Sequence, residues 1–350
     1  MNKKSASPNY RNMLAELNQT LERDPDNVEA YYRRSELHYN QDNYSAGIKD
    51  LDAILHRNSE AILAYIFRGY GYDKLGDKQK AIDDYTAAIA LYPNYAKAYY
   101  NRGIVYQKLE QYERAIADYT LAIKINPDYI EAYYNRGIVY NKLEQHLPAI
   151  SDYTQAIRLN REDAEAYYNR ANTYNRIKQY AQAITDYDRV IELNPKDIEA
   201  YYNRANVYHK TKVYDRAIAD YSQVIKHNPR HAPTYYNRGT TYLSNEQYQL
   251  AIADFSQAVE LNPNYAEAYY NRAISYNKIE KYSEAVLDHQ QAIALKDDYA
   301  EAYGNLGLVY QTLDEKDKAV ENLVIAAKLF KKQNNQPLYK YVSNKLETLK

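Results

Sequence analysis

The chain repeats one short segment at a constant interval of 34 residues along almost its whole length. Residues 132–137, with the sequence AYYNRG, are a representative copy. The first tyrosine of this segment recurs at Tyr31, Tyr65, Tyr99, Tyr133, Tyr167, Tyr201, Tyr235, Tyr269 and Tyr303. A period of this length is typical of stacked helix–turn–helix units, none of which buries its apolar surface alone. We therefore expect one all-α solenoid, although 350 residues alone would suggest roughly two or three domains.

The repeat at residues 131–164 predicts how the two helices of each unit pack. Small and apolar residues recur at helical spacing: Tyr133, Gly137 and Tyr140 in the first helix, and Ile150, Tyr153, Ala156 and Ile157 in the second. Residues 143–146 are expected to form the turn between the helices. We expect Gly137 and Ala149 to face each other, because small residues let two helices approach closely.

The two ends of the chain depart from the repeat. We expect residues 1–8 to be a flexible tail and residues 9–28 to be a half repeat that caps the N-terminal end of the array. Nine full repeats are predicted to follow at 29–334. The segment 335–350 is expected to form a closing helix, with one apolar face made of Leu338, Tyr341, Val342, Leu346 and Leu349.

The composition argues against several classes of function. With 45 basic and 46 acidic residues, the net charge of −1 gives no overall attraction to nucleic acid. The absence of cysteine removes disulfides, thiolate metal sites and cysteine nucleophiles. We find no phosphate-binding loop and no metal-ligand cluster, so we expect neither an enzyme nor a bound cofactor or metal. The chain has neither a signal peptide nor a long apolar run, and we expect a cytoplasmic protein without direct membrane insertion.

On these residues the chain resembles the tetratricopeptide repeat (TPR) family. The resemblance is carried by a set of packing and turn positions, namely Tyr133, Gly137, Tyr140, Ala149, Tyr153, Ala156 and the turn prolines Pro127 and Pro195. The segment after Phe330 is similar to the tails of multi-repeat TPR proteins of photosynthetic bacteria. The resemblance implies a right-handed superhelical solenoid of about nine TPR repeats with capping helices at both ends. It also implies that the first helices line a concave groove that binds protein or peptide.

One column of the first helix is constant without being apolar, and it consists of Asn101, Asn135, Asn169, Asn203, Asn237, Asn271 and Asn305. An amide both donates and accepts hydrogen bonds, so it can pair with a peptide backbone whatever the peptide sequence. The column resembles the asparagine ladder of the TPR superhelix in O-GlcNAc transferase, which implies peptide binding at Asn101 to Asn271. The alternative is that duplication of the repeat copied the asparagine. Tyrosines such as Tyr100 and Tyr134 stand where carboxylate-clamp TPR domains of chaperone adaptors carry lysines, which argues against that ligand class.

Two further columns lie on the same side of the first helices. The second tyrosine of each pair is expected to form an amphipathic wall for peptide side chains, with packing against the neighbouring first helix as the alternative: Tyr100, Tyr134, Tyr168, Tyr202, Tyr236 and Tyr270. Basic residues near the ends of the first helices form a basic groove edge made of Lys108, Lys142, Arg176 and Lys210. Such residues commonly oppose the helix dipole, and here they also have the charge to attract acidic partner segments.

A last constant pair connects the two helices of one repeat. Arg136 in the first helix and Asp152 in the second recur together from Arg34 and Asp50 onward. The ninth repeat loses both residues, since Leu306 stands at the arginine position and Asn322 at the aspartate position. Joint loss predicts a salt bridge within the repeat rather than a ligand site.

The sequence therefore predicts a noncatalytic scaffold that holds an extended partner segment in its groove through the asparagine and tyrosine columns. Two other roles stay open. One is a self-assembling structural scaffold, a homo-oligomer that uses its ends or its convex surface. The other is a substrate-recruiting module for a separate enzyme. The expected partner is in each case a protein or an extended peptide and not nucleic acid.

Overall fold

The computed structural model describes residues 8–349, and every regular element among them is a helix. The helices are α1 (Pro8–Arg23), α2 (Val28–Tyr39), α3 (Tyr44–Arg57), α4 (Ile62–Leu75), α5 (Lys78–Leu91), α6 (Ala96–Lys108), α7 (Tyr112–Ile125), α8 (Ile130–Lys142), α9 (His146–Leu159), α10 (Ala164–Arg176), α11 (Tyr180–Leu193), α12 (Ile198–Lys210), α13 (Tyr214–His227), α14 (Ala232–Ser244), α15 (Tyr248–Leu261), α16 (Ala266–Lys278), α17 (Tyr282–Leu295), α18 (Ala300–Thr312), α19 (Lys316–Lys332) and α20 (Gln336–Leu349). The all-α fold of paired helices is confirmed. The predicted flexible tail lies outside the described residues except for Pro8, which begins α1.

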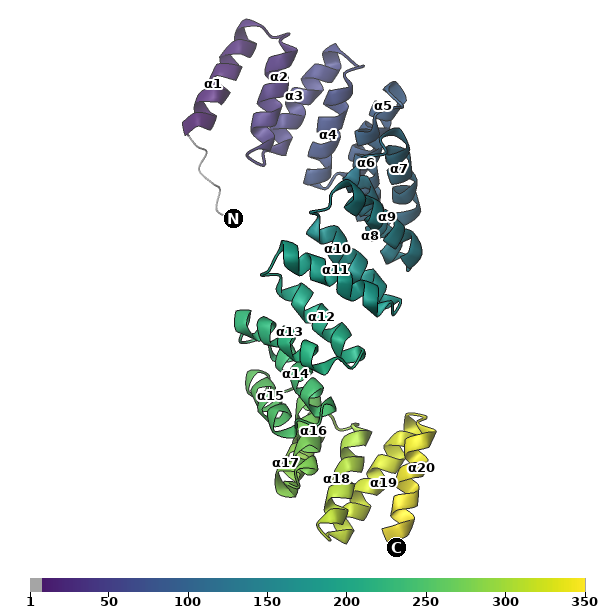
Figure 1. Cartoon of the computed structure of the whole chain (residues 1–350). Coiled ribbons are helices and arrows are strands. Elements are labelled where there is room, and N and C mark those ends of the chain that lie inside the picture. Colours follow the sequence, from purple (N-terminus) through teal and green to yellow (C-terminus); the bar gives the residue numbers. More distant parts are fainter. Residues whose placement is uncertain (1–7, 350) are drawn as a thin grey trace. The chain divides into compact units, whose positions relative to one another are not determined.

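The chain divides into two compact units, one that ends at Thr173 and one that begins at Tyr174, so that the boundary falls within the sequence of α10. Within each unit, a first helix packs against the second helix of its own repeat, as α6 packs on α7. Each second helix then packs against the first helix of the next repeat, as α7 packs on α8. Figure 1 shows this sequential stacking, in which neighbours in space are also neighbours in the sequence.

A buried aromatic ring from the second helix fills the space between the two helices of most repeats. Tyr153 of α9 is 1% exposed, and a Cβ atom added at Gly137 of α8 would lie 2.8 Å from its ring. Gly137 therefore lies directly against the ring of Tyr153. In other repeats, a Cβ atom added at Gly69 or Gly307 would also lie 3.3 or 3.1 Å from the backbone carbonyl oxygen of Ala81 or Ala319, the counterparts of Ala149. The position of Tyr153 holds Tyr85, Tyr119, Tyr187, Tyr221, Phe255 and His289 in other repeats, all almost fully buried.

The turn inside each repeat is shorter than predicted, since His146 already belongs to α9. Its central residue, Glu144, has a φ of 58°, in the left-handed region that ends many helices. The amide of Gln145 donates to the carbonyl of Tyr140 at 2.8 Å and closes the end of α8. The equivalent turn after α4 has glycine, Gly76, at a φ of 91°.

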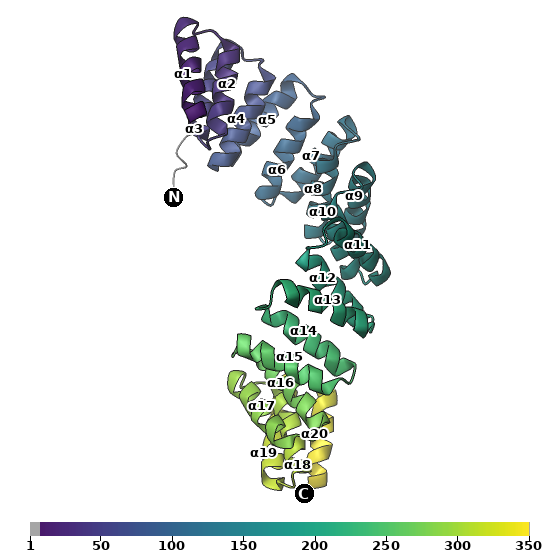
Figure 2. The same ribbon diagram turned by 60° about the vertical axis from the view of Figure 1, so that its left-hand side comes forward.

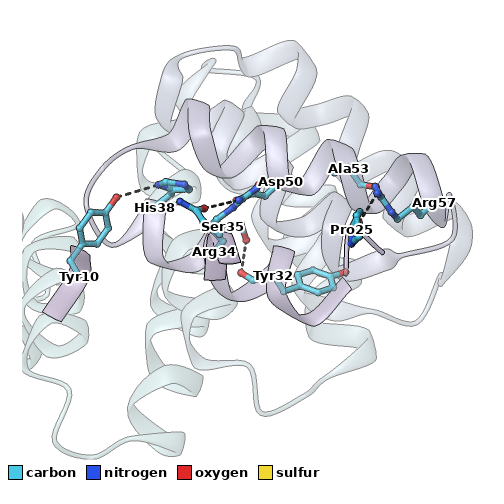
Figure 3. A network of polar contacts seen from close by, with 10 residues as sticks. Tyr10, Pro25, Tyr32, Arg34, Ser35, His38, Asp50, Ala53 and Arg57 are labelled. Carbon is cyan, nitrogen blue, oxygen red and sulfur yellow. Dashed lines mark hydrogen bonds and ion pairs between the residues drawn. The ribbon is translucent and has the colours of Figure 1, made fainter. Parts of the chain in front are cut away.

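The N-terminal helix α1 takes the place of a second helix against α2. The hydroxyl of Tyr10 is hydrogen-bonded to His38 Nδ1 at 3.3 Å, a contact that Figure 3 shows from close by. The side chain of Asn18 accepts a hydrogen bond from Arg34 Nη1 at 2.8 Å, and Leu21 is buried beneath. The helix thus covers the outer side of the first repeat, as an end cap must.

At the other end, α20 packs on α19 (Figure 2). Val342 is buried at 3% exposure, and Tyr339, Leu346 and Leu349 pack around it. Two residues predicted for this face, Leu338 and Tyr341, are exposed at 36% and 50%. The buried stripe therefore follows Tyr339, Val342 and Leu346 at spacings of three and four residues, so that Tyr341 falls on the opposite side.

Candidate functional site

The predicted asparagine and tyrosine columns lie together on one side of the first helices. We call this side the first-helix face and define it by the two columns on α6, α8, α10, α12, α14 and α16. All twelve side chains are partly buried: Asn101, Asn135, Asn169, Asn203, Asn237, Asn271, Tyr100, Tyr134, Tyr168, Tyr202, Tyr236 and Tyr270. The residues of both columns are therefore neither fully buried in the core nor fully exposed to solvent.

The two columns are joined by hydrogen bonds between neighbouring repeats. The amide Nδ2 of an asparagine donates to the hydroxyl of the second tyrosine in the preceding repeat. The bonds are Asn135 to Tyr100 at 2.9 Å, Asn169 to Tyr134 at 2.8 Å, Asn237 to Tyr202 at 2.9 Å, Asn271 to Tyr236 at 3.1 Å and Asn305 to Tyr270 at 3.0 Å. Such a bond between partly buried groups contributes about 0.5–1.5 kcal/mol, so the columns help to hold successive repeats together.

Asn101 differs from the rest of its column. In the preceding repeat the tyrosine is replaced by Ile66, which is 3% exposed and has no hydroxyl to offer. Among the described residues, no hydrogen bond to the side chain of Asn101 is found. The asparagine is therefore kept in this repeat without its tyrosine partner, which means that the Asn–Tyr bond does not explain the whole column.

The bonds also fix the direction in which each amide points. One N–H of Asn135 Nδ2 donates to Tyr100, so its other N–H is left to donate and its carbonyl oxygen Oδ1 is left to accept a further hydrogen bond. Asn169 uses both N–H groups of Nδ2, which donate to Tyr134 and to the backbone carbonyl of Glu165, so only its Oδ1 is left. No described residue donates to Oδ1 of Asn135 or Asn169. The first-helix face thus presents oriented hydrogen-bond acceptors.

The tyrosine hydroxyls of this face keep their protons. Burial, together with the nearby carboxylate of Glu131, raises the pKa of Tyr100. Burial and the carboxylate of Glu165 raise the pKa of Tyr134, whose hydroxyl donates to Glu165 Oε2 at 3.2 Å. Tyr100 accepts from Asn135 and still has its own hydroxyl proton, so it is a donor on the same face.

Two hollows open on the first-helix face, and each is lined by one asparagine of the column, Asn135 or Asn237. One has a volume of about 330 Å³ and lies between α8 and α10, beside Tyr134 and Asn135. The other has about 200 Å³ and lies between α12 and α14, beside Asn206 and Asn237. Their volumes are at or below the lower end of the range of about 300–1,000 Å³ that is usual for small-molecule pockets.

The basic groove edge is divided by its contacts. Lys108 forms an ion pair with Asp73 of the preceding repeat, and Lys78 pairs with the same carboxylate at 2.7 Å. Although burial acts against it, hydrogen bonds from the two lysines hold the pKa of Asp73 below its usual value. Lys210 donates to Asn175 Oδ1 at 3.3 Å. These contacts give Lys108 and Lys210 a structural role between repeats.

The other two residues of the basic edge are Lys142 and Arg176, and both are exposed. Neither is drawn into an ion pair with any of the described acidic residues. They keep the charge needed to attract an acidic partner segment.

The predicted salt bridge between the two helices of a repeat is confirmed. In α8 and α9, Arg136 donates through Nε and Nη2 to both carboxylate oxygens of Asp152 at 2.8 and 2.7 Å. Its third nitrogen, Nη1, donates to Thr120 on the second helix of the preceding repeat at 2.8 Å. Only 15% of the Arg136 side chain and 5% of Asp152 are exposed. The guanidinium therefore links three helices, and it is not open to a ligand.

Two of the histidines that drew attention in the sequence have contacts within the fold. His209 Nδ1 is hydrogen-bonded to the hydroxyl of Thr241 at 2.9 Å, and His289 is buried in the aromatic position of α17. Across residues 8–349, no cluster of three or more histidine, aspartate or glutamate side chains is arranged to hold a metal ion.

Sequence reasoning missed a third column on this face, at the residue before each first helix. Tyr129 stacks on Tyr100 with ring centroids 4.8 Å apart, and Tyr265 stacks on Tyr236 at the same distance. The signal was present in the sequence, because tyrosine stands at this position in four repeats: Tyr95, Tyr129, Tyr265 and Tyr299. A tyrosine at this position can stack only where the preceding repeat has its second tyrosine, as Tyr100 and Tyr236 show.

Sequence profiles described as tetratricopeptide repeat match residues 9–62, 96–129, 130–163, 164–197, 198–231, 232–265, 255–286 and 300–330. Profiles described as TPR repeat match residues 69–110 and 275–314. No curated protein matches the sequence. None of the described helices has the length and apolar character needed to cross a membrane.

Solved structures of similar fold include other repeat proteins. The C-terminal part of a TPR repeat-containing protein from Cytophaga hutchinsonii is similar with a TM-score of 0.61 and 18% identity, over 69% of this chain and 98% of that one. A tetratricopeptide repeat protein from Parabacteroides merdae has a TM-score of 0.49 and 23% identity, over 71% and 99%. YrrB, described as a TPR protein with an unusual peptide-binding site, has a TM-score of 0.49 and 27% identity, over 53% and 95%.

Proposed function

Since the chain belongs to the tetratricopeptide repeat family, we propose that it is a noncatalytic scaffold that holds an extended segment of a partner protein on its first-helix face. TPR proteins generally bind other proteins, and this surface has the features that such binding requires. It presents aromatic rings, oriented polar groups and small hollows along consecutive helices of the same unit.

The observation that carries the proposal is the orientation of the asparagine column. Each Nδ2 that is bonded to a tyrosine leaves Oδ1 to accept an N–H group from a peptide backbone. Every residue of a peptide except proline offers such an N–H group, so the contact does not depend on the peptide sequence. Packed helices lie roughly 8–10 Å apart and an extended chain rises roughly 3.3 Å per residue. About every third residue of the peptide would therefore meet an asparagine.

The partly buried tyrosines supply the apolar component of binding. Rings such as Tyr100 and Tyr134 lose little conformational entropy when a peptide covers them, because their hydroxyls are already bonded to the protein. The asparagine oxygens hold the peptide backbone, and the hollows beside them select side chains.

The test is a selection from a library of random linear peptides displayed on phage, followed by affinity measurements with the synthetic peptides. The triple variant Asn101→Ala, Asn135→Ala and Asn169→Ala, with all three residues in one compact unit, is expected to weaken the selected peptides on the order of a hundredfold, because about three backbone contacts are lost. The matched control is Leu147→Ala with Leu287→Ala, at residues 70% and 66% exposed on second helices.

Circular dichroism of each variant verifies that the helices are intact. Equal binding by the triple variant and the wild-type protein would contradict the proposal, and so would a library that yields no binding peptide. Binding lost in the second-helix control alone would place the partner on the other side of the array.

A further inference from the structure

The hollow between α8 and α10 lies where the stacking column has an aspartate in place of a ring. In three repeats, the residue before the first helix is a tyrosine that stacks on the second tyrosine of the preceding repeat. The stacked pairs are Tyr129 on Tyr100, Tyr265 on Tyr236 and Tyr299 on Tyr270, with ring centroids 4.8–4.9 Å apart. Before α10 and α12 the same position holds Asp163 and Asp197, and the hollow lies beside Asp163. Tyr134 therefore has no ring stacked on it from that position, and the space is the hollow of about 330 Å³.

The groups around this space are almost all hydrogen-bond acceptors. Three carboxylates line it, those of Glu131, Asp163 and Glu165, and no basic side chain does. Asp163 uses Oδ1 to accept from the amide of Ala166 at 3.0 Å, which leaves Oδ2 free to accept another bond. Glu165 accepts from the hydroxyl of Tyr134, and its carboxylate is fixed beside the ring by that bond.

Asn135 adds a neutral acceptor to the same space. One N–H of its Nδ2 donates to Tyr100, and no described residue donates to its Oδ1. Tyr100 contributes the one remaining hydroxyl proton on this side of the hollow. A ligand for the hollow must then be a planar donor with positive charge that stacks on Tyr134 and reaches the carboxylates.

We propose that this hollow binds an arginine side chain of the peptide held on the first-helix face, with its guanidinium stacked on Tyr134 in the place of the missing ring. A guanidinium is planar, stacks on aromatic rings and donates in a fork that matches carboxylate oxygens. A lysine ammonium has the positive charge but is not planar, and a phenylalanine ring is planar but has no hydrogen-bond donor. The inference rests on the proposed function, and it assigns the hollow as the position that selects for sequence.

The hollow can be filled with a residue that other repeats already have at the equivalent position. Asp163→Tyr places at this position the residue that occurs at Tyr129, Tyr265 and Tyr299, where the helices pack in the same way. The matched control is Glu267→Gln, which removes the carboxylate equivalent to Glu165 in a repeat whose stacking position is filled by Tyr265.

The experiment takes the best arginine-containing peptide from the phage selection and compares it with the same peptide carrying citrulline, which keeps the shape of arginine without its charge. We expect the wild-type protein and Glu267→Gln to bind the arginine peptide on the order of tenfold more tightly than the citrulline peptide. Asp163→Tyr is expected to bind both peptides equally, at the affinity of the citrulline form.

Equal binding of the two peptides by the wild-type protein would overturn the inference. So would a preference for arginine that persists in Asp163→Tyr, because the arginine would then bind elsewhere. A selection that yields binders without enriched arginine would also overturn it. In each of these outcomes peptides still bind, so the proposed function stands, whereas a selection without binders contradicts the proposed function itself.

Discussion

Replacing the buried histidine of α17 is expected to change how the stability of the chain depends on pH. His289 is 1% exposed and stands where other repeats have a fully buried tyrosine or phenylalanine. Its Nδ1 has no hydrogen-bond partner among the described residues, and its ring lies 5.7 Å from that of Tyr270. Burial therefore lowers the pKa of His289 to about 4, from an ordinary value of 6.5.

The sign and size of the effect follow from this shift. The folded chain keeps His289 neutral, while the unfolded chain binds a proton as the pH falls through 6.5, so acid favours unfolding. The stabilisation is present above the unfolded pKa and is lost as the pH falls from about 6.5 towards about 4. Between about pH 7 and about pH 5 the two pKa values give a loss of about 2 kcal/mol.

The variant His289→Phe removes the titrating group and places in the column the residue that Phe255 already provides one repeat earlier. We expect wild-type protein to lose about 2 kcal/mol more than the variant over this pH range. The assay is hydrogen exchange of the amides of α17 and α18, because a repeat array opens locally. A His289 imidazole that titrates by NMR above about pH 6, or equal pH dependence in both proteins, would refute the reasoning.

Three further predictions concern contacts between helices and between repeats. Arg102 and Asp118 of α6 and α7 form the salt bridge equivalent to that of Arg136 and Asp152. In a double-mutant cycle, Arg102→Ala and Asp118→Ala are each expected to lower the free energy of unfolding in urea by about 3 kcal/mol, and the double variant by distinctly less than the sum. Tyr134→Phe removes the hydroxyl that accepts from Asn169 and is expected to cost about 1 kcal/mol, seen as faster amide exchange in α8 and α10. Because its pKa is lowered, Asp73 stabilises the fold above its unfolded pKa of 3.8 and loses this effect as the pH falls further, so Asp73→Asn is expected to flatten acid unfolding curves in that range.

Each of these predictions has an internal control. Additive losses for the arginine and aspartate variants would contradict a direct pair. For the tyrosine, Asn101→Ala is expected to have little effect on stability, since Asn101 has no hydroxyl partner, and an equal cost at both sites would contradict the bond. If Asp73→Asn unfolds in acid as the wild-type protein does, the contacts with the two lysines do not lower the pKa of Asp73.

The repeat of 34 residues was sufficient to predict the helical architecture, because local periodicity and stacking determine it together. The salt bridge between Arg136 and Asp152 could also be predicted, since the ninth repeat varies both positions at once and so shows their coupling. The buried face of the closing helix was predicted only in part. Leu338, Tyr339, Tyr341 and Val342 allow two adjacent apolar faces on the same helix, and the buried one includes Tyr339 and Val342 but neither Leu338 nor Tyr341. Only packing on α19 decides between the two faces.

The bonds between the asparagine and tyrosine columns could not be predicted in the same way. They join residues 35 positions apart in different repeats, and their geometry depends on how successive repeats pack. The column gives no sign of coupling either, since Asn101 persists where Ile66 has replaced the tyrosine. The hollow at Asp163 was missed for a related reason. It lies where an aspartate replaces a stacked ring, and this is recognised only by comparison with the stacked pair of Tyr100 and Tyr129.

The central claim is that the oriented amides of the first-helix face hold the backbone of an extended peptide. A crystal structure of the full chain with a selected peptide tests it most directly. We predict that the peptide lies extended across α8 and α10, with its backbone N–H groups donating to Oδ1 of Asn135 and Asn169 while both asparagines keep their bonds to Tyr100 and Tyr134. A peptide bound to the second helices, or one whose backbone makes no hydrogen bond to either asparagine, would contradict the claim.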